Sequence, residues 1–224
     1  MSRAVATFIL LTLATACQSV PFPEYTKAVG DASPNTTVAK RAGFQCTLRA
    51  VLTLSGNEVV FTIYGLSHGH GNLRMVAVAD IGGTMFDVSL SDGYSAIHQG
   101  SPVLGDDFIA NHLVRDFAEA TREQEPDRSI VVKLADGSRA TLHTHGPESV
   151  LYQLAPARDK ATVYRGVSAR LESTATIDFV SSGIPEGAMR PSAFTITSAD
   201  KARSMQCVVV DWSPIEAATV QPNP

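Results

Sequence analysis

The sequence predicts a mainly β (α+β) protein: a large curved antiparallel sheet of about ten strands, forming an open half-barrel with at least one helix across its concave face. Two observations lead to this prediction. Apolar and polar residues alternate with a period of two over most of residues 43–212, which is typical of strands with one buried face. Helical periodicity marks one segment, and one helix covers a large sheet most simply by lying across a curved one.

The first 16 residues differ in kind from the rest. Arg3 gives a positive start, and residues 4–16 form an almost wholly apolar run that is too short for a typical membrane-spanning helix. This pattern predicts a secretory signal peptide. The run ends in Leu13-Ala14-Thr15-Ala16-Cys17 and resembles the lipobox of bacterial lipoproteins. The resemblance implies that Cys17 is lipidated and becomes the mature N-terminus, and that Gln18 directs it to the outer membrane. The alternative is a secreted protein cleaved near Ala16.

Residues 17–42 are predicted to be the lipidated N-terminus and a flexible tether, because Pro21, Pro23 and Pro34 lie among small and polar residues without a sustained period. Residues 213–224 contain three further prolines and are predicted to form a loose tail. The half-barrel domain is therefore expected over residues 43–212.

Within this domain the strands are expected to follow one another as a meander. Ser55-Gly56-Asn57, Asp92-Gly93, Asp136-Gly137 and Ala199-Asp200-Lys201 are typical turn sequences between them. The expected strands cover residues 44–48, 59–63, 73–79, 86–90, 129–135, 139–143, 149–154, 161–165, 169–180, 192–197 and 205–212.

The expected helix begins at Gly105-Asp106-Asp107, where two acidic residues suit the positive end of the helix dipole. Its apolar residues fall on one stripe, which would face the sheet. They are Ile109, Leu113, Val114 and Phe117.

Two stretches of the domain carry a family resemblance. Residues 73–88 run from a strand through Asp80-Ile81-Gly82-Gly83-Thr84 into an alternating strand, and Ala188-Met189-Arg190-Pro191 is followed by a hairpin ending at Trp212. This order resembles the outer-membrane lipoprotein receptor family LolB, and a LolB-like lipoprotein family linked to aryl-polyene and polyketide-type gene clusters. The resemblance implies a half-barrel of the LolA/LolB superfamily with an apolar cavity for acyl chains. Its expected partners are outer-membrane lipid, the acyl chains of a lipoprotein or lipid cargo, and a LolA-like periplasmic carrier.

The same resemblance assigns a role to the turn at Ile81, Gly82 and Gly83. LolB inserts an exposed apolar residue at the corresponding turn into the membrane, which makes Ile81 the expected membrane-insertion residue. The alternative is that Ile81 packs at the end of a strand. Residues 65–71 depart from the family because they insert a loop rich in glycine and histidine.

Histidine spacing offers the main support for a metal site. His143 and His145 are two residues apart in a predicted strand, and His68 and His70 could supply two more ligands. No carboxylate has the spacing of a known metal motif, so surface or turn histidines are expected instead. Ser95 lacks the glycine that closes a hydrolase nucleophile elbow. We therefore expect no enzyme activity, no metal and no cofactor, and the net charge of −4 without a basic cluster argues against nucleic acid.

Two alternatives remain open at this stage. Cys46 and Cys207 lie in the first and last predicted strands of the domain, where they are expected to be buried thiols unless the two strands are close enough for a disulfide. Acyl-chain binding has its own alternative, a structural or accessory lipoprotein without a ligand. An apolar cavity under the sheet would favour the first function, and a filled core the second.

Overall fold

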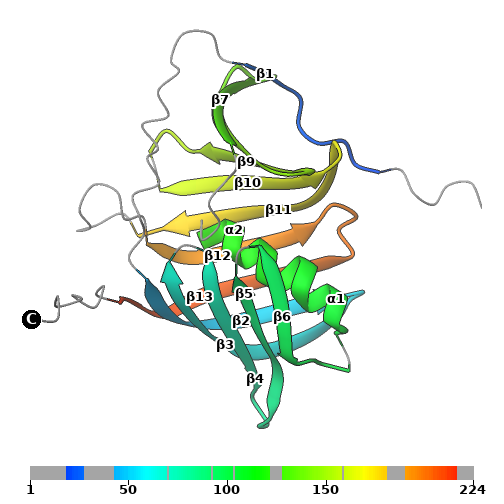
Figure 1. Cartoon of the computed structure of the whole chain (residues 1–224), viewed down its shortest axis with the longest axis vertical. Coiled ribbons are helices and arrows are strands. Elements are labelled where there is room, and N and C mark those ends of the chain that lie inside the picture. The colour runs from blue at the N-terminus through cyan, green and yellow to red at the C-terminus, as the bar shows by residue number, and fades with distance from the viewer. Residues whose placement is uncertain are drawn as a thin grey trace, which may run out of the picture.

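Thirteen strands of the chain form a single antiparallel sheet that curves around one helix, as the computed structural model shows (Figure 1). The structure describes residues 19–27, 43–69, 71–91, 93–102, 104–121, 128–157, 159–180 and 190–215. The strands are β1 (Tyr25–Lys27), β2 (Phe44–Leu54), β3 (Asn57–Gly69), β4 (Asn72–Ala79), β5 (Thr84–Ser91), β6 (Tyr94–Gln99), β7 (Arg128–Leu134), β8 (Arg139–His145), β9 (Glu148–Leu154), β10 (Lys160–Val167), β11 (Arg170–Phe179), β12 (Pro191–Ser198) and β13 (Arg203–Pro214).

The order of strands across the sheet is β1-β7-β8-β9-β10-β11-β12-β13-β2-β3-β4-β5-β6. The last strand, β13, therefore pairs with β2 in the interior of the sheet, and β1 and β6 form its two edges. The sheet is not closed, which confirms the predicted open half-barrel. It has thirteen strands among the described residues where about ten were expected.

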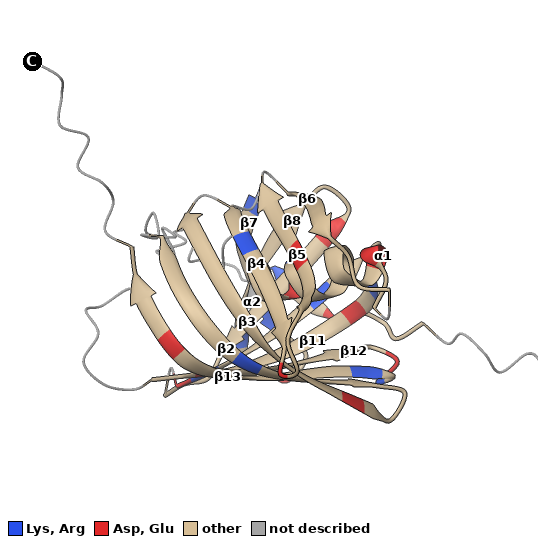
Figure 2. Ribbon diagram, turned by 90° about the horizontal axis from the view of Figure 1, so that it is seen from below, with Lys and Arg blue, Asp and Glu red and all other residues tan. Residues whose placement is uncertain are grey.

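The helix crosses the concave face of the sheet (Figure 2). It is continuous through α1 (Asp106–Phe108), a π-helical segment η1 (Ile109–Val114) and α2 (Arg115–Thr121). Its first half packs on β5 and β6, and its second half packs on β10, β11 and β12. Ile109, Leu113, Val114 and Phe117 are all buried, so the predicted apolar stripe is confirmed.

Alternation along the strands supplies the other side of this core. In β2, for example, Phe44, Cys46, Leu48, Ala50 and Leu52 point inward, whereas the residues between them are exposed or half-buried. The same pattern brings Phe61, Phe86, Phe194 and Ile177 into one cluster with the helix. Burial of apolar surface on this face is the main term that stabilises the fold.

A second apolar cluster lies on the opposite face of the sheet. Val150 and Tyr152 belong to the core under the helix, but Leu151 between them belongs to a cluster with Val132 and Leu142. Neighbouring residues of a strand point to opposite faces, so β9 is apolar on both sides, whereas β7 and β8 contribute their apolar residues to the second cluster. Phe22 of the N-terminal segment packs against this second cluster.

Part of the expected tether thus lies on the sheet. Residues 25–27 form β1, which pairs with β7 from Tyr25–Leu134 to Lys27–Val132. For residues 21–27 the expectation of a flexible tether is wrong, because Phe22 has an apolar face to cover and β7 offers an unpaired edge. The remaining residues of the predicted tether before 19 and after 27, most of the predicted tail, and residues 1–18 with Cys17 and Gln18 lie outside the described residues.

Residues 65–71 also differ from expectation, since residues 65–69 are part of β3 rather than a loop. A side chain at Gly65 would place its Cβ 2.7 Å from Sγ of Cys46 and 3.8 Å from the ring of Phe117. Glycine therefore makes room here for the Cys46 side chain of the neighbouring strand β2 and is not part of a turn.

The two cysteines of the domain are closer than an open half-barrel suggested, because β2 and β13 are neighbours. Cys207 lies opposite Ala50, and Cys46 lies opposite Trp212, so the register keeps the two residues apart along the strands. They do not form a disulfide, and both are buried, as expected for small apolar side chains. Burial raises the pKa of the Cys207 thiol.

Candidate functional site

The concave face is the first part of the candidate lipid site, and the helix fills it. A pocket between helix and sheet, lined by Leu52, Phe108, His112 and Met205 among others, has a volume of only about 20 Å³. This volume holds about one water molecule, whereas pockets for small ligands measure about 300–1,000 Å³. At this place the expected apolar cavity is not open, and an acyl chain can enter only if the helix moves.

Buried charges hold the helix in this position. Arg165 of β10 donates from Nε to Oδ1 of Asp116 in α2 at 2.6 Å and from Nη1 to Oε1 of Glu148 in β9 at 3.2 Å. It also donates from Nη2 to the carbonyl oxygen of Asn111 at 3.2 Å. Ser173 donates to the same oxygen of Asp116 at 2.7 Å. One arginine therefore joins two turns of the helix to the sheet.

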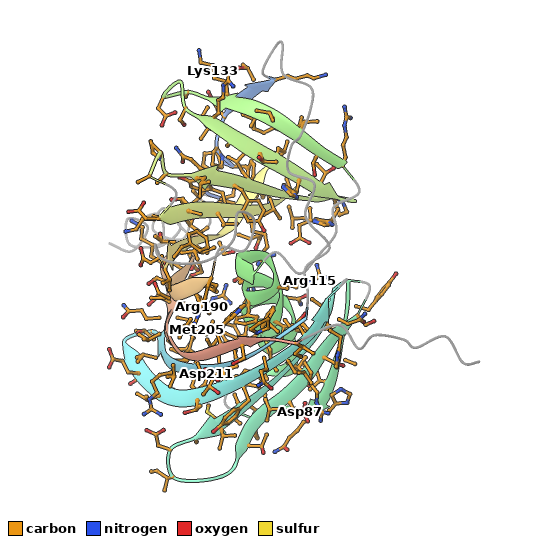
Figure 3. All side chains as sticks on the ribbon, turned by 90° about the vertical axis from the view of Figure 1, so that its left-hand side faces the viewer. Asp87, Arg115, Lys133, Arg190, Met205 and Asp211 are labelled. Atoms are coloured by element: carbon orange, nitrogen blue, oxygen red, sulfur yellow. The ribbon has the colours of Figure 1, made fainter. Side chains whose placement is uncertain are left out.

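Arg115 extends this network toward the edge of the sheet. Its Nη1 lies 3.1 Å from Oε2 of Glu148, and its Nη2 donates to the carbonyl oxygen of Gly93. Figure 3 shows Arg115 beside the helix, above the lower half of the sheet. Burial raises the pKa of Asp116, although Arg165 and Ser173 oppose this shift. Desolvation would lower the pKa of Arg165, but Asp116 and Glu148 outweigh it and the pKa is raised, so the guanidinium stays charged.

No spacing pattern in the sequence predicts this network, because Asp116 and Arg165 lie 49 residues apart. A weak signal does exist in β10, where Ala161, Val163 and Arg165 alternate on the inward face. A charge in an inward position of a strand indicates a buried partner.

His112 stands at the rim of the small pocket, on the helix face toward β13. Its ring centroid lies 5.7 Å from that of Phe108. The guanidinium carbon of Arg203 lies over the ring of Phe108, 5.1 Å from its centroid. Burial lowers the pKa of His112 to about 4, and the positive charges of Arg203 and Arg165 add to this effect. The imidazole is therefore neutral in the folded protein at neutral pH.

The turn between β4 and β5 is the second part of the candidate site. The side chain of Ile81 is 100% exposed, as the sequence-based prediction of an exposed turn requires. Gly82 and Gly83 have φ angles of 85° and 108°, which other residues rarely adopt, and the amide of Ala79 donates to the carbonyl of Gly83. Arg49 pairs with Asp80 at the base of the turn, and this hydrogen bond lowers the pKa of Asp80. The turn is thus a defined structure with an apolar tip.

The histidines are dispersed. His143 is buried with its ring 5.0 Å from that of Tyr152, His145 lies opposite Glu148 in the β8–β9 pair, and His68 is exposed on β3. His70 lies outside the described residues. Within the part of the chain that the structure describes, no three His, Cys, Asp or Glu side chains are close enough to hold a metal ion. Ser95 lies on edge strand β6 rather than on a strand-to-helix turn.

Among the described residues, no helix combines the length and the apolar character needed to cross a membrane.

Comparisons with known proteins point to fold neighbours. No family model matches the chain, and no curated protein matches its sequence. Similar solved structures include the LolA superfamily protein NE2245 from Nitrosomonas europaea, with 14% identity over 80% of this chain and 90% of that chain and a TM-score of 0.43. A domain named for outer membrane lipoprotein sorting from Vibrio parahaemolyticus shares 11% identity over 79% and 86%, with a TM-score of 0.43. A DUF1329 family protein from Desulfovibrio piger shares 11% over 80% and 88%, with a TM-score of 0.47.

The buried network leads to a prediction about stability. Replacing Arg165 with Met leaves the carboxylates of Asp116 and Glu148 buried without their central cation. We expect the free energy of unfolding at pH 7, measured in urea, to fall by about 3–5 kcal/mol. The loss should become smaller as the pH is lowered, because burial raises the pKa of Asp116 and protonation of its carboxylate removes the buried charge. Arg74→Met is the control, since Arg74 is 56% exposed and its pair with Asp87 lies at the surface. An equal effect of the two variants would contradict a holding role for Arg165.

His112 leads to a second prediction, on pH dependence. The unfolded chain binds a proton at His112 near pH 6.5, but the folded protein resists it until about pH 4. The stability that depends on the neutral ring is therefore complete above pH 6.5 and is lost as the pH falls toward 4. We expect the melting temperature to drop less between pH 7.5 and pH 5 in His112→Gln than in the unmodified protein. Identical pH profiles would show that His112 does not carry this dependence.

Proposed function

We propose that this protein is anchored by lipid in the outer membrane through Cys17, binds acyl chains on the concave face of its sheet, and helps to deliver a lipoprotein or another lipid to the membrane. Binding, not catalysis, is the proposed activity. Acyl chains need only dry apolar surface, which contributes about 25 cal/mol per Å². A LolA-like periplasmic carrier is the proposed donor of the cargo.

Ile81 is the observation that carries the proposal. A fully exposed isoleucine at the tip of a turn has no contact to make within its own chain. Pairing of Asp80 with Arg49 and the two glycines hold the turn in shape without covering Ile81. An apolar side chain presented in this way is suited to insertion among lipid chains.

Entry of an acyl chain requires the helix to leave the concave face. The inward residues of β2, β3 and β12 would then line an apolar trough. The ion pair of Arg165 with Asp116 opposes this movement, because separating the two side chains leaves buried charges without a partner. Cargo binding is thus proposed to compete with the helix for the same apolar surface.

A second function is favoured by the filled interior. A protein whose concave face is already covered could serve as an accessory lipoprotein that binds no ligand. The small volume beside His112 is the observation that supports this alternative.

The single tryptophan separates the two functions. Trp212 stacks on Phe44 with ring centroids 4.0 Å apart and packs against the core under the helix. We expect a brominated fatty acid to quench its fluorescence in a saturable way, while the unbrominated acid does not. Arg165→Met should bind the acid more tightly, because the helix is then easier to displace. An accessory protein without a ligand would show no saturable quenching in either form.

The turn gives a test of membrane contact. Ile81→Glu places a charge at the apolar tip, so transfer of bound acyl chains to liposomes should fall several-fold while acyl binding is retained. The melting temperature should hardly change because the side chain is fully exposed. Ile81→Leu keeps an apolar tip and should transfer normally. A marked loss of melting temperature in Ile81→Glu, or unchanged transfer, would contradict the proposed role of the turn.

A further inference from the structure

We propose that residues 20–27 form a strap that holds the lipidated end of the chain at one rim of the sheet, so that this rim faces the bilayer. The inference rests on the proposed lipid anchor at Cys17. Beyond the anchor, the inference states which surface of the domain faces the membrane.

The strap is fixed first by its backbone. The amide of Leu171 donates to the carbonyl of Val20 at 2.9 Å, and the amide of Phe22 donates to the carbonyl of Ala169 at 3.1 Å. Between them, Pro21 forms an isolated bridge with Arg170. Three consecutive residues therefore pair with the turn between β10 and β11.

Side-chain packing and β1 fix the rest of the strap. Phe22 covers Gly166, where an added Cβ would lie 2.4 Å from its ring and 2.6 Å from the carbonyl oxygen of Arg170. The ring of Phe22 also meets that of Tyr25 edge to face at 6.5 Å. From Tyr25 onward the chain continues as β1 along β7. Any side chain at position 166 would therefore collide with the ring of Phe22.

The strap shortens the distance between anchor and domain. Cys17 precedes Val20 by three residues, which span at most about 10–11 Å when fully extended. A free tether over residues 17–42 would have a root-mean-square length of about 25–30 Å. Docking of the strap therefore shortens the free linker between the lipid anchor and the domain, here called the leash. It also fixes the point on the domain where the leash begins.

That point lies on one rim of the sheet. Because neighbouring strands are antiparallel, successive turns alternate between two rims of the sheet. On the rim that carries the β10–β11 turn, backbone hydrogen bonds join neighbouring turns. The amide of Ser168 donates to Pro147, that of Ala199 to Glu172, and that of Ser55 to Ala202. The turn of Ile81 follows at the same ends of the strands, whereas β13 leaves the sheet from the opposite rim. We call the first the anchor rim (Figure 1).

Charge does not distinguish the anchor rim, since exposed Arg170 and Lys201 lie near exposed Glu58 and Asp200. The short leash and the apolar tip of Ile81 are what select it. The partner proposed for this rim is the surface of a phospholipid bilayer.

A matched pair of spin labels tests the orientation. Ala202→Cys lies on the anchor rim and Ala157→Cys on the opposite rim, and both positions are exposed. The full-length lipidated protein is reconstituted in phosphatidylethanolamine and phosphatidylglycerol vesicles that contain a nickel-chelating lipid. We expect nickel at the bilayer surface to relax the label at position 202 several-fold more strongly than the label at 157. Equal relaxation at the two positions would overturn the inference.

An insertion separates the strap from other causes of orientation. Twelve Gly and Ser residues placed between Ser19 and Val20 leave the strap docked but lengthen the leash, so the difference between the labels should largely disappear at an unchanged melting temperature. A difference that survives the insertion would overturn the role of the strap. Mass spectrometry distinguishes the two levels of the proposal: absence of acyl chains on Cys17 refutes the anchor and the inference with it, whereas an acylated protein with equal labels refutes the inference alone.

Discussion

An open sheet with one apolar face is not a stable structure by itself, and the cover over that face is the constraint on which this molecule depends. The cover is one helix. Ile109, Val114 and Phe117 have no exposed surface because they meet the inward residues of strands from both halves of the sheet. The helix and the curvature of the sheet therefore depend on each other.

Apolar contacts alone do not specify where a helix lies along a trough, because many placements bury similar areas. The ion pairs of Arg165 with Asp116 and of Arg115 with Glu148 join the sheet to the helix, so they are satisfied in one placement and leave buried charges in others. The same feature connects the filled interior to the proposed binding of acyl chains. The helix is one continuous element, so displacing it breaks these polar contacts and its apolar contacts without breaking any pairing between strands.

Most of the sheet could be predicted from the sequence, because inward and outward residues alternate clearly in strands such as β2, β5 and β12. The helix was predictable from its apolar stripe, and the exposed turn from Gly82 and Gly83. The two edge strands were not predicted: β1 is exposed at all three positions and β6 is largely exposed, so neither shows a buried side. Residues 65–69 were missed because their composition is that of a loop. The pairing of β13 with β2, like that of Arg165 with Asp116, joins residues that are far apart in the sequence. Local sequence patterns do not predict such contacts.

The position of β13 has a consequence for how the protein is made. Its residues 203–214 pair with residues 44–54, so strands from the two ends of the domain meet in the interior of the sheet. The halves β2–β6 and β7–β12 each contain mostly local pairings and can begin to order early, but strand pairing joins them only when the final strand arrives, although the helix packs on both. Closing such a long loop is slow compared with forming hairpins. A chain emerging from a translocation channel or a ribosome therefore remains two unfinished sheets, with an exposed apolar seam, until residues 203–214 have been released.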